Sequence, residues 1–160
     1  MCGIVGVYRT GGETIDLQQL QRATQALHHR GPDDEGYVLI NTVSQRVVAC
    51  GGRDTDATGF RRLAILDLSP AGHQPMSDDE GRLWLVFNGE IYNFLEIRSE
   101  LVQRGHHFHS QCDTEVILHA YQEWGEACVQ RFNGMWAFVV VDLRRGRLFC
   151  SRDRLGVKPF

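Results

Sequence analysis

Residues 1–8, MCGIVGVY, decide how the rest of the chain is interpreted. Their β-branched residues, set between glycines, predict a strand that begins at residue 2 and holds down a terminus that is normally frayed. Removal of Met1 would leave Cys2 with both a thiol and a free α-amine. An α-amine has a pKa of about 7.7–8.0, so it can serve as the base for a nucleophilic thiol. The alternative for Cys2 is a buried strand cysteine without chemistry.

Beyond this strand, blocks of strands and helices follow one another. Apolar spacing predicts helices within residues 15–31, 95–104 and 113–125, with Asn93 as the cap of the second. It predicts strands at residues 36–40, 45–51, 61–68, 82–89, 135–143 and 146–153. The strand at 82–89 is expected to end in an Asn-Gly turn, and the last two strands to form a hairpin around residues 144–146. Strand blocks separated by helix blocks favour an α+β layered sandwich over an alternating parallel sheet.

Composition excludes several classes of function. The 160 residues suffice for one domain with a core of its own, and the net charge of −3 leaves no basic footprint for nucleic acid. No apolar run reaches the roughly 20 residues that span a bilayer. The N-terminus lacks a charged n-region followed by an apolar h-region, so we expect that it is not a signal peptide. The five cysteines form no CxxC pair, so we expect reduced thiols and a cytoplasmic location.

Polar residues at the ends of predicted elements are candidates for chemistry. The side-chain amide of Asn88 and the backbone N–H of Gly89 suit a developing oxyanion, although Asn-Gly also forms ordinary hairpin turns. Arg61 or Arg62 suits a ligand carboxylate, or is a solvated charge at a strand end. Asp113, with Glu115 in the same helical turn, suits a substrate ammonium or merely caps its helix.

A cluster of histidines near residue 109 raises the question of a metal site. His106, His107, His109 and Cys112 lie close in the sequence, and such side chains can bind zinc. No second Cys/His pair at finger spacing completes a tetrahedral set. We therefore expect no metal, and histidines exposed on an edge strand.

Seven stretches together resemble the signature blocks of class II glutamine amidotransferases. They occur in the order MCGIVGVY, HHRGPDDEG, RRLAILDLSPAGHQPM, LVFNGEIYNF, CDTEVILHAY, FNGMWAFVVVD and SRDRLGVKPF. More narrowly, the chain is similar to the N-terminal glutaminase domain of glutamine-hydrolysing asparagine synthetases, enzymes of amino-acid biosynthesis. The resemblance implies one domain over residues 1–160 with Met1 removed. It also implies the four-layer αββα sandwich of N-terminal nucleophile hydrolases, an α+β fold.

The resemblance also implies a role for each catalytic residue. Cys2 is the implied nucleophile, its α-amine the implied base, and Asn88 with Gly89 the implied oxyanion hole. The expected reaction converts L-glutamine to glutamate and ammonia through a thioester on Cys2. The alternative is a catalytically silent binding or regulatory module, which retention of Met1 would favour.

Recognition of glutamine is implied to use a second set of residues. Arg62 is expected to hold the α-carboxylate, and Glu90 with Asp113 to surround the α-ammonium. The backbone that lines this glutamine site is expected to be that of Leu63, Ala64, Ile65 and Leu66.

The ammonia is expected to serve a synthetase domain of the asparagine-synthetase type. No SGG-x-DS stretch occurs in these 160 residues, so we expect that domain, with its ATP and Mg²⁺, outside this chain. No cofactor is expected within residues 1–160. An acceptor that is a sugar or a cell-envelope precursor is an alternative, and a homodimer is left open.

Overall fold

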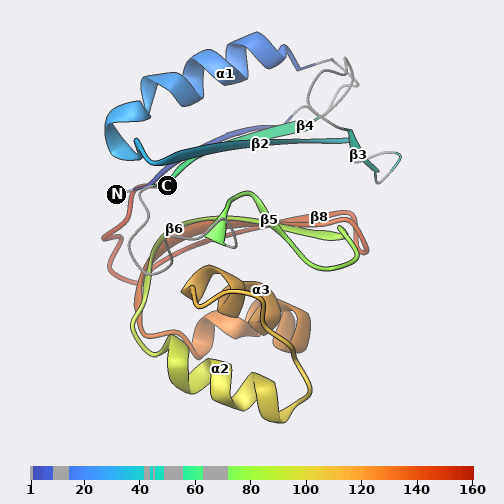
Figure 1. Ribbon diagram of the computed structural model, residues 1–160, viewed down its shortest axis with the longest axis vertical. Helices are drawn as coiled ribbons and strands as arrows, with labels where there is room; N and C mark the ends of the chain where they lie inside the picture. The colour runs from blue at the N-terminus through green and yellow to red at the C-terminus, as the bar shows by residue number, and fades with distance from the viewer. Residues whose placement is uncertain (1, 9–14, 42–43, 45, 49–55, 63–71) are drawn as a thin grey trace.

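The computed structural model describes residues 2–8, 15–41, 44, 46–48, 56–62 and 72–160. Two antiparallel sheets lie face to face, with one helix above the first sheet and two helices below the second (Figure 1). This arrangement confirms the predicted α+β four-layer αββα sandwich.

The upper sheet contains the strand that follows Cys2. Its strands are arranged in the order β1, β4, β2, β3, with bounds Gly3–Val7, Asp56–Arg62, Asp34–Asn41 and Arg46–Val48. The predicted strand at 2–8 is confirmed. The strand predicted at 61–68 is wrong in its start, because β4 already begins at Asp56, and residues 63–68 lie outside the described residues. DATGFRR, at residues 56–62, lacks apolar alternation, and its place between β1 and β2 comes from pairing with both.

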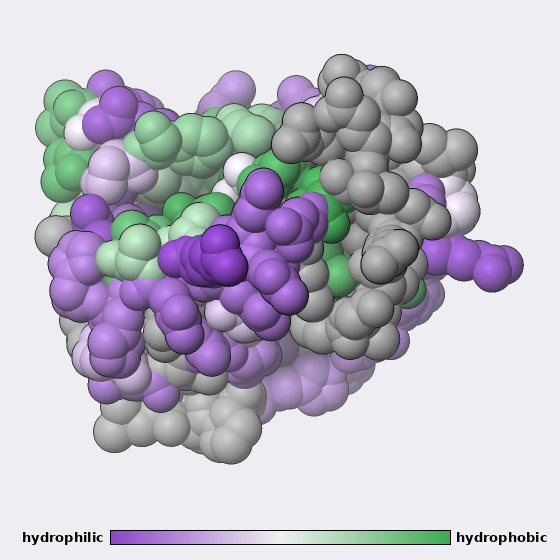
Figure 2. Space-filling view, turned by 90° about the horizontal axis from the view of Figure 1, so that it is seen from above, coloured by the Kyte–Doolittle hydropathy of each residue, from purple (hydrophilic) through white to green (hydrophobic). Residues whose placement is uncertain are grey.

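Helix α1, Leu17–Ala26, covers the upper sheet. The Asp16 carboxylate caps it by accepting a hydrogen bond from Gln18 N at 2.9 Å. Leu20 and Thr24, one turn apart, are buried against the sheet, where Leu20 packs with Leu39. The outward face of α1 is hydrophilic (Figure 2), as expected for an amphipathic helix. A short 3₁₀ turn, η1, follows at His28–Arg30.

The lower sheet carries most of the hydrophobic core. Its strands are β5, β6, β7 and β8, with bounds Met76–Ser77, Leu83–Ile91, Gly134–Asp142 and Arg147–Arg152. Below it lie α2, α3 and the 3₁₀ helix η3, with bounds Phe94–Gln103, Asp113–Trp124 and Gly125–Gln130. Phe87, Ile91 and Phe138 pack against Val116 and Ile117 of α3. The two predicted helices here and the hairpin around residues 144–146 are confirmed.

Two local predictions in this half are wrong. Asn88-Gly89 is not a turn, because β6 continues to Ile91 and Gly89 pairs with Trp136 of β7. Asn93 precedes α2, but its side chain makes no cap hydrogen bond. Instead its amide donates to Arg131 O at 3.0 Å and its oxygen accepts from Asn133 N at 2.8 Å.

The histidines near residue 109 also differ from the expectation, since residues 106–109 form no strand. His107 and His109 are exposed, whereas His106 is half-buried and bonded through Nε2 to Glu123 at 3.2 Å. Within the described ranges, no three His, Cys, Asp or Glu side chains are grouped as metal ligands. None of the helices in those ranges is long and apolar enough to cross a membrane.

Candidate active site

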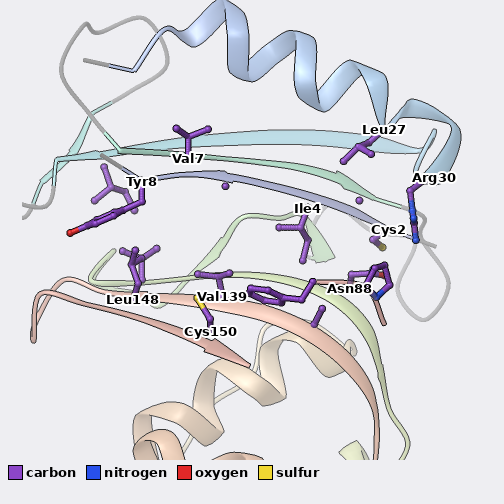
Figure 3. Close-up of a pocket in the computed structure, with 17 residues that line it drawn as sticks. Cys2, Ile4, Val7, Tyr8, Leu27, Arg30, Asn88, Val139, Leu148 and Cys150 are labelled. Atoms are coloured by element: carbon purple, nitrogen blue, oxygen red, sulfur yellow. The ribbon is translucent and has the colours of Figure 1, made fainter. Parts of the chain in front are cut away.

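A cavity of about 490 Å³ lies between the two sheets. Its walls come from β1 and β2 above, from β6, β7 and β8 below, and from the last residues of the chain. Most of its lining is apolar. Cys2, Arg30 and Asn88 gather at one end of it, whereas Tyr8 and Leu148 lie at the other (Figure 3). The nucleophile and the oxyanion amide expected from the sequence therefore share one end of one cavity.

Asn88 reaches the cavity because side chains alternate along a strand. Leu85, Phe87 and Ile91 of β6 face the helices and join the core, so Asn88 faces the upper sheet. The side chain is only 4% exposed. A buried amide at the cavity wall is a donor of the kind that stabilises a negative oxygen.

The backbone N–H of Gly89 points away from the neighbouring strand β7. Its pairing partner Trp136 turns both of its polar backbone groups the other way: Trp136 N donates to Asp153 Oδ2 at 3.2 Å, and Trp136 O accepts from Asp153 N at 2.8 Å. In antiparallel sheets such a pair exchanges no hydrogen bonds. The N–H of Gly89 is therefore directed to the opposite edge of β6, which β5 pairs only at Trp84 and Leu85.

The neighbouring donors on that open edge of β6 are both occupied. Phe87 N donates to Gln74 Oε1 at 2.7 Å, and Ile91 N donates to Asp113 Oδ2 at 2.9 Å. Between them, no acceptor among the described residues takes the N–H of Gly89. A donor held in place without a protein acceptor is available to a ligand.

A side chain at position 89 would collide with β7. A Cβ built on Gly89 lies 2.2 Å from Met135 O and 2.8 Å from Trp136 Cα. Glycine is thus required by the close approach of the two strands, independently of any role of its N–H.

Asp113 begins α3 and lies beside the same open edge of β6. Its side chain is buried, and burial is the main reason that the pKa of Asp113 rises to about 7. The negative charge of Glu90 adds to the rise, whereas the hydrogen bond from Ile91 opposes it. Near neutral pH this carboxyl group is close to half ionised, and an ammonium group of a ligand would favour the ionised form. Gly89, Glu90 and Asp113 lie together near this edge rather than in the lining of the cavity.

Glu115 is separated from this site, although the sequence places it beside Asp113. It accepts hydrogen bonds from His109 N at 2.7 Å and from Ser110 N at 2.7 Å, and His119 lies near it. Burial opposes ionisation of Glu115, but the hydrogen bonds outweigh burial and lower its pKa to about 2. Glu115 therefore fixes the turn before α3.

Arg62 ends β4 at the Cys2 side of the upper sheet. Arg61 pairs with Gly3, so the backbone of Arg62 lies one residue beyond, level with Cys2. Its side chain and residues Leu63–Leu66, the rest of the predicted glutamine site, lie outside the described residues.

Arg30 was missed as a site residue from the sequence. It lies in η1 and lines the cavity at the Cys2 end (Figure 3). Its Nε is buried without a hydrogen-bond partner in the described part of the chain. An unsatisfied buried donor is costly, so its position at a cavity favours an anionic or carbonyl ligand there. Arg30 lies in the block HHRGPDDEG, for which the resemblance implies no site residue.

The fold is shared with a solved structure. A solved structure of glutamine phosphoribosylpyrophosphate amidotransferase from Bacillus subtilis matches 99% of this chain and 38% of its own, with a TM-score of 0.73 and 21% identity.

The sequence comparisons then give the family. Residues 1–160 match the family model described as glutamine amidotransferase domain, and the chain belongs to that family. All of the chain is 44% identical to a putative glutamine-hydrolyzing asparagine synthetase of Methanocaldococcus jannaschii and 41% identical to glutamine-hydrolyzing asparagine synthetase 3 of Bacillus subtilis. The chain spans 31% and 24% of the length of these relatives.

Proposed function

We propose that this glutamine amidotransferase domain hydrolyses the side-chain amide of L-glutamine through Cys2. One observation carries the proposal: Cys2 and Asn88 share one end of the cavity, and the N–H of Gly89 has no acceptor in the described part of the chain. A nucleophile with a side-chain amide at the same end of the cavity, and an available backbone N–H on the next residue, supplies the groups that acyl transfer requires.

The proposed reaction begins after removal of Met1. The Cys2 thiol gives its proton to the α-amine, and the thiolate attacks the side-chain carbonyl carbon of glutamine. Asn88 and the N–H of Gly89 hold the oxyanion. The protonated α-amine of Cys2 then returns the proton to the leaving ammonia. Water then cleaves the γ-glutamyl thioester and releases glutamate and the thiol.

Two groups of residues make the proposed contacts with glutamine. Arg62, with the backbone of Leu63–Leu66, holds the α-carboxylate, and Glu90 with Asp113 receives the α-ammonium. The buried carboxyl group of Asp113 supports this role because a cation beside it would favour its ionised form.

The ammonia, we propose, goes to an asparagine-forming synthetase, a ligase whose ATP and Mg²⁺ belong to its own domain. The two asparagine synthetase relatives support this acceptor over a sugar or a cell-envelope precursor. The thiol and α-amine of Cys2 suffice for the glutaminase step without a cofactor. Cys112 and Cys128 are in no disulfide among the described residues, and the proposed location is the reducing cytoplasm.

A glutaminase assay with two cysteine variants tests the proposal. Cys2→Ala should abolish formation of glutamate and ammonia while the thermal unfolding midpoint stays within a few degrees of the parent. Cys150→Ala is the matched control, because its thiol lines the same cavity away from the Asn88 end (Figure 3). Mass spectrometry of the N-terminus shows whether Met1 is gone. Full activity in Cys2→Ala, or activity with Met1 retained, would contradict the mechanism.

A further inference from the structure

The turn after β8 is built around one buried carboxylate. Asp153 Oδ1 accepts hydrogen bonds from Leu155 N at 3.1 Å and from Val157 N at 2.8 Å. Its Oδ2 accepts from Lys158 N at 2.9 Å and from Trp136 N at 3.2 Å. Burial disfavours the charge, but these four donors outweigh burial and lower the pKa of Asp153 to about 2. The turn is therefore closed on a permanent anion.

Two arginines hold the same turn, Arg152 through carbonyls of the turn itself and Arg154 through carbonyls outside it. Arg152 donates from Nε to Lys158 O at 2.6 Å and from Nη2 to Gly156 O at 2.6 Å. Gly156 has a φ of +66°, and a Cβ there would lie 3.2 Å from the Arg152 guanidinium. Arg154 donates two further bonds to carbonyls in and just after η3. Such a turn has little freedom to change shape.

The turn is attached where the oxyanion donors lie. Asp153 exchanges both backbone and side-chain bonds with Trp136, the pairing partner of Gly89. From this point the chain brings Pro159 and Phe160 to the cavity that Cys2 lines. Phe160 is 64% exposed, so its ring lines the cavity without filling a packed core.

We propose that residues 153–160 are a preformed wall of the Cys2 cavity that limits which molecules reach the thiol. Phe160 supplies the apolar surface of this wall, and Asp153 is the positioning residue that holds it. The identity of the substrate, a small unbranched side-chain amide, rests on the proposed function, but the wall does not. Because the wall is already ordered, it contributes to binding without an ordering cost.

Kinetics of three variants test the wall. Phe160→Ala and Asp153→Asn should each raise KM for glutamine about tenfold with kcat within about twofold, since the wall acts equally on bound substrate and transition state. Asn at 153 places an NH₂ group against N–H donors that need an acceptor. The matched control is Asp78→Asn, another buried carboxylate that accepts two backbone N–H bonds, from Arg82 and Leu83 at the far end of β6. It should leave KM unchanged.

Alkylation of Cys2 gives a readout that needs no glutaminase activity. Peptide mass mapping follows Cys2 modification by iodoacetamide and by the bulkier N-phenylmaleimide. The measured quantity is the ratio of the alkylation rate with N-phenylmaleimide to the rate with iodoacetamide. Both wall variants should raise this ratio about tenfold, and Asp78→Asn should not. If the parent cleaves no glutamine but the rate ratio changes in this way, the wall stands and the proposed function falls. An unchanged ratio in both wall variants, or the same change in Asp78→Asn, overturns the wall.

Discussion

The carboxyl group of Asp113 accepts a hydrogen bond from the backbone N–H of Ile91 at 2.9 Å. This bond joins the first residue of α3 to the open edge of β6, two residues beyond Gly89. It places the buried, titratable carboxyl group of Asp113 beside the edge of β6 to which the N–H of Gly89 is directed. The protonation state of one side chain therefore affects both the stability of the layer packing and the charge that a ligand meets.

Asp113 should make the protein less stable as the pH rises. Its pKa is about 7 in the folded protein and about 3.9 when unfolded, so folding keeps the proton and the stabilisation is lost between those values. From pH 5 to pH 8 the parent should lose on the order of 2–3 kcal/mol relative to Asp113→Asn, which keeps an oxygen for Ile91 N. Urea unfolding at both pH values measures this. Parallel pH profiles for parent and variant would contradict it.

Asn88→Ala should lower kcat for glutamine hydrolysis by about 10²–10³, because it removes one oxyanion donor. Steady-state kinetics with a thermal melt measure the effect and the integrity of the fold. Asn93→Ala is the matched control, since that amide bridges Arg131 and Asn133 away from the cavity. It should reduce stability without a comparable loss of kcat. Equal kcat losses in the two variants would count against an oxyanion role.

Gly89→Ala should destabilise the fold by about 1–3 kcal/mol or more, since the new methyl group overlaps Met135 O. Gly81→Ala is the control: its φ of +64° is strained for alanine, but nothing lies within 4 Å of the added Cβ. That variant should cost about 1 kcal/mol. Chemical unfolding of both variants separates the clash from backbone strain. A smaller loss at position 89 than at 81 would be inconsistent with the strand spacing.

Arg30→Met should leave stability unchanged or raise it by about 1 kcal/mol, because it removes a buried donor without an acceptor. It should raise KM for glutamine about tenfold if Arg30 bonds the substrate. Arg22→Met, on the exposed face of α1, should change neither quantity. An unfolding curve measures the change in stability, and steady-state kinetics measure the change in KM. If Arg30→Met is less stable than the parent and keeps the parental KM, Arg30 has a structural role.

The sequence predicted the elements whose signals are local. The strand after Cys2, the amphipathic helix at 113–125 and the hairpin around residues 144–146 follow from alternation, periodicity and turn residues. The prediction was wrong where pairing with strands distant in the sequence determines the local structure. Asn88-Gly89 continues a strand because β7 pairs with it, and β4 forms because β1 and β2 flank it.

Some residues of the candidate site could likewise be predicted from the sequence, and others could not. Cys2, Asn88 and Gly89 are predicted from the sequence because their groups suit acyl transfer, and the fold brings Cys2 and Asn88 to one end of a cavity. Arg30 was missed because an arginine in a turn reveals nothing until its burial is known. The roles of Asp153 and Phe160 depend on a turn that closes back on β7, which no local pattern predicts.

The central claim is that Cys2, with its own α-amine, is the nucleophile for a glutamine amide. The most direct test is to incubate the parent with the glutamine analogue diazo-oxo-norleucine and to map the modified peptide by mass spectrometry. We expect one adduct, on an N-terminal Cys2 that has lost Met1, whose formation glutamine suppresses and which Asn88→Ala slows. An unmodified Cys2, or an adduct on another cysteine that glutamine does not suppress, would contradict the claim.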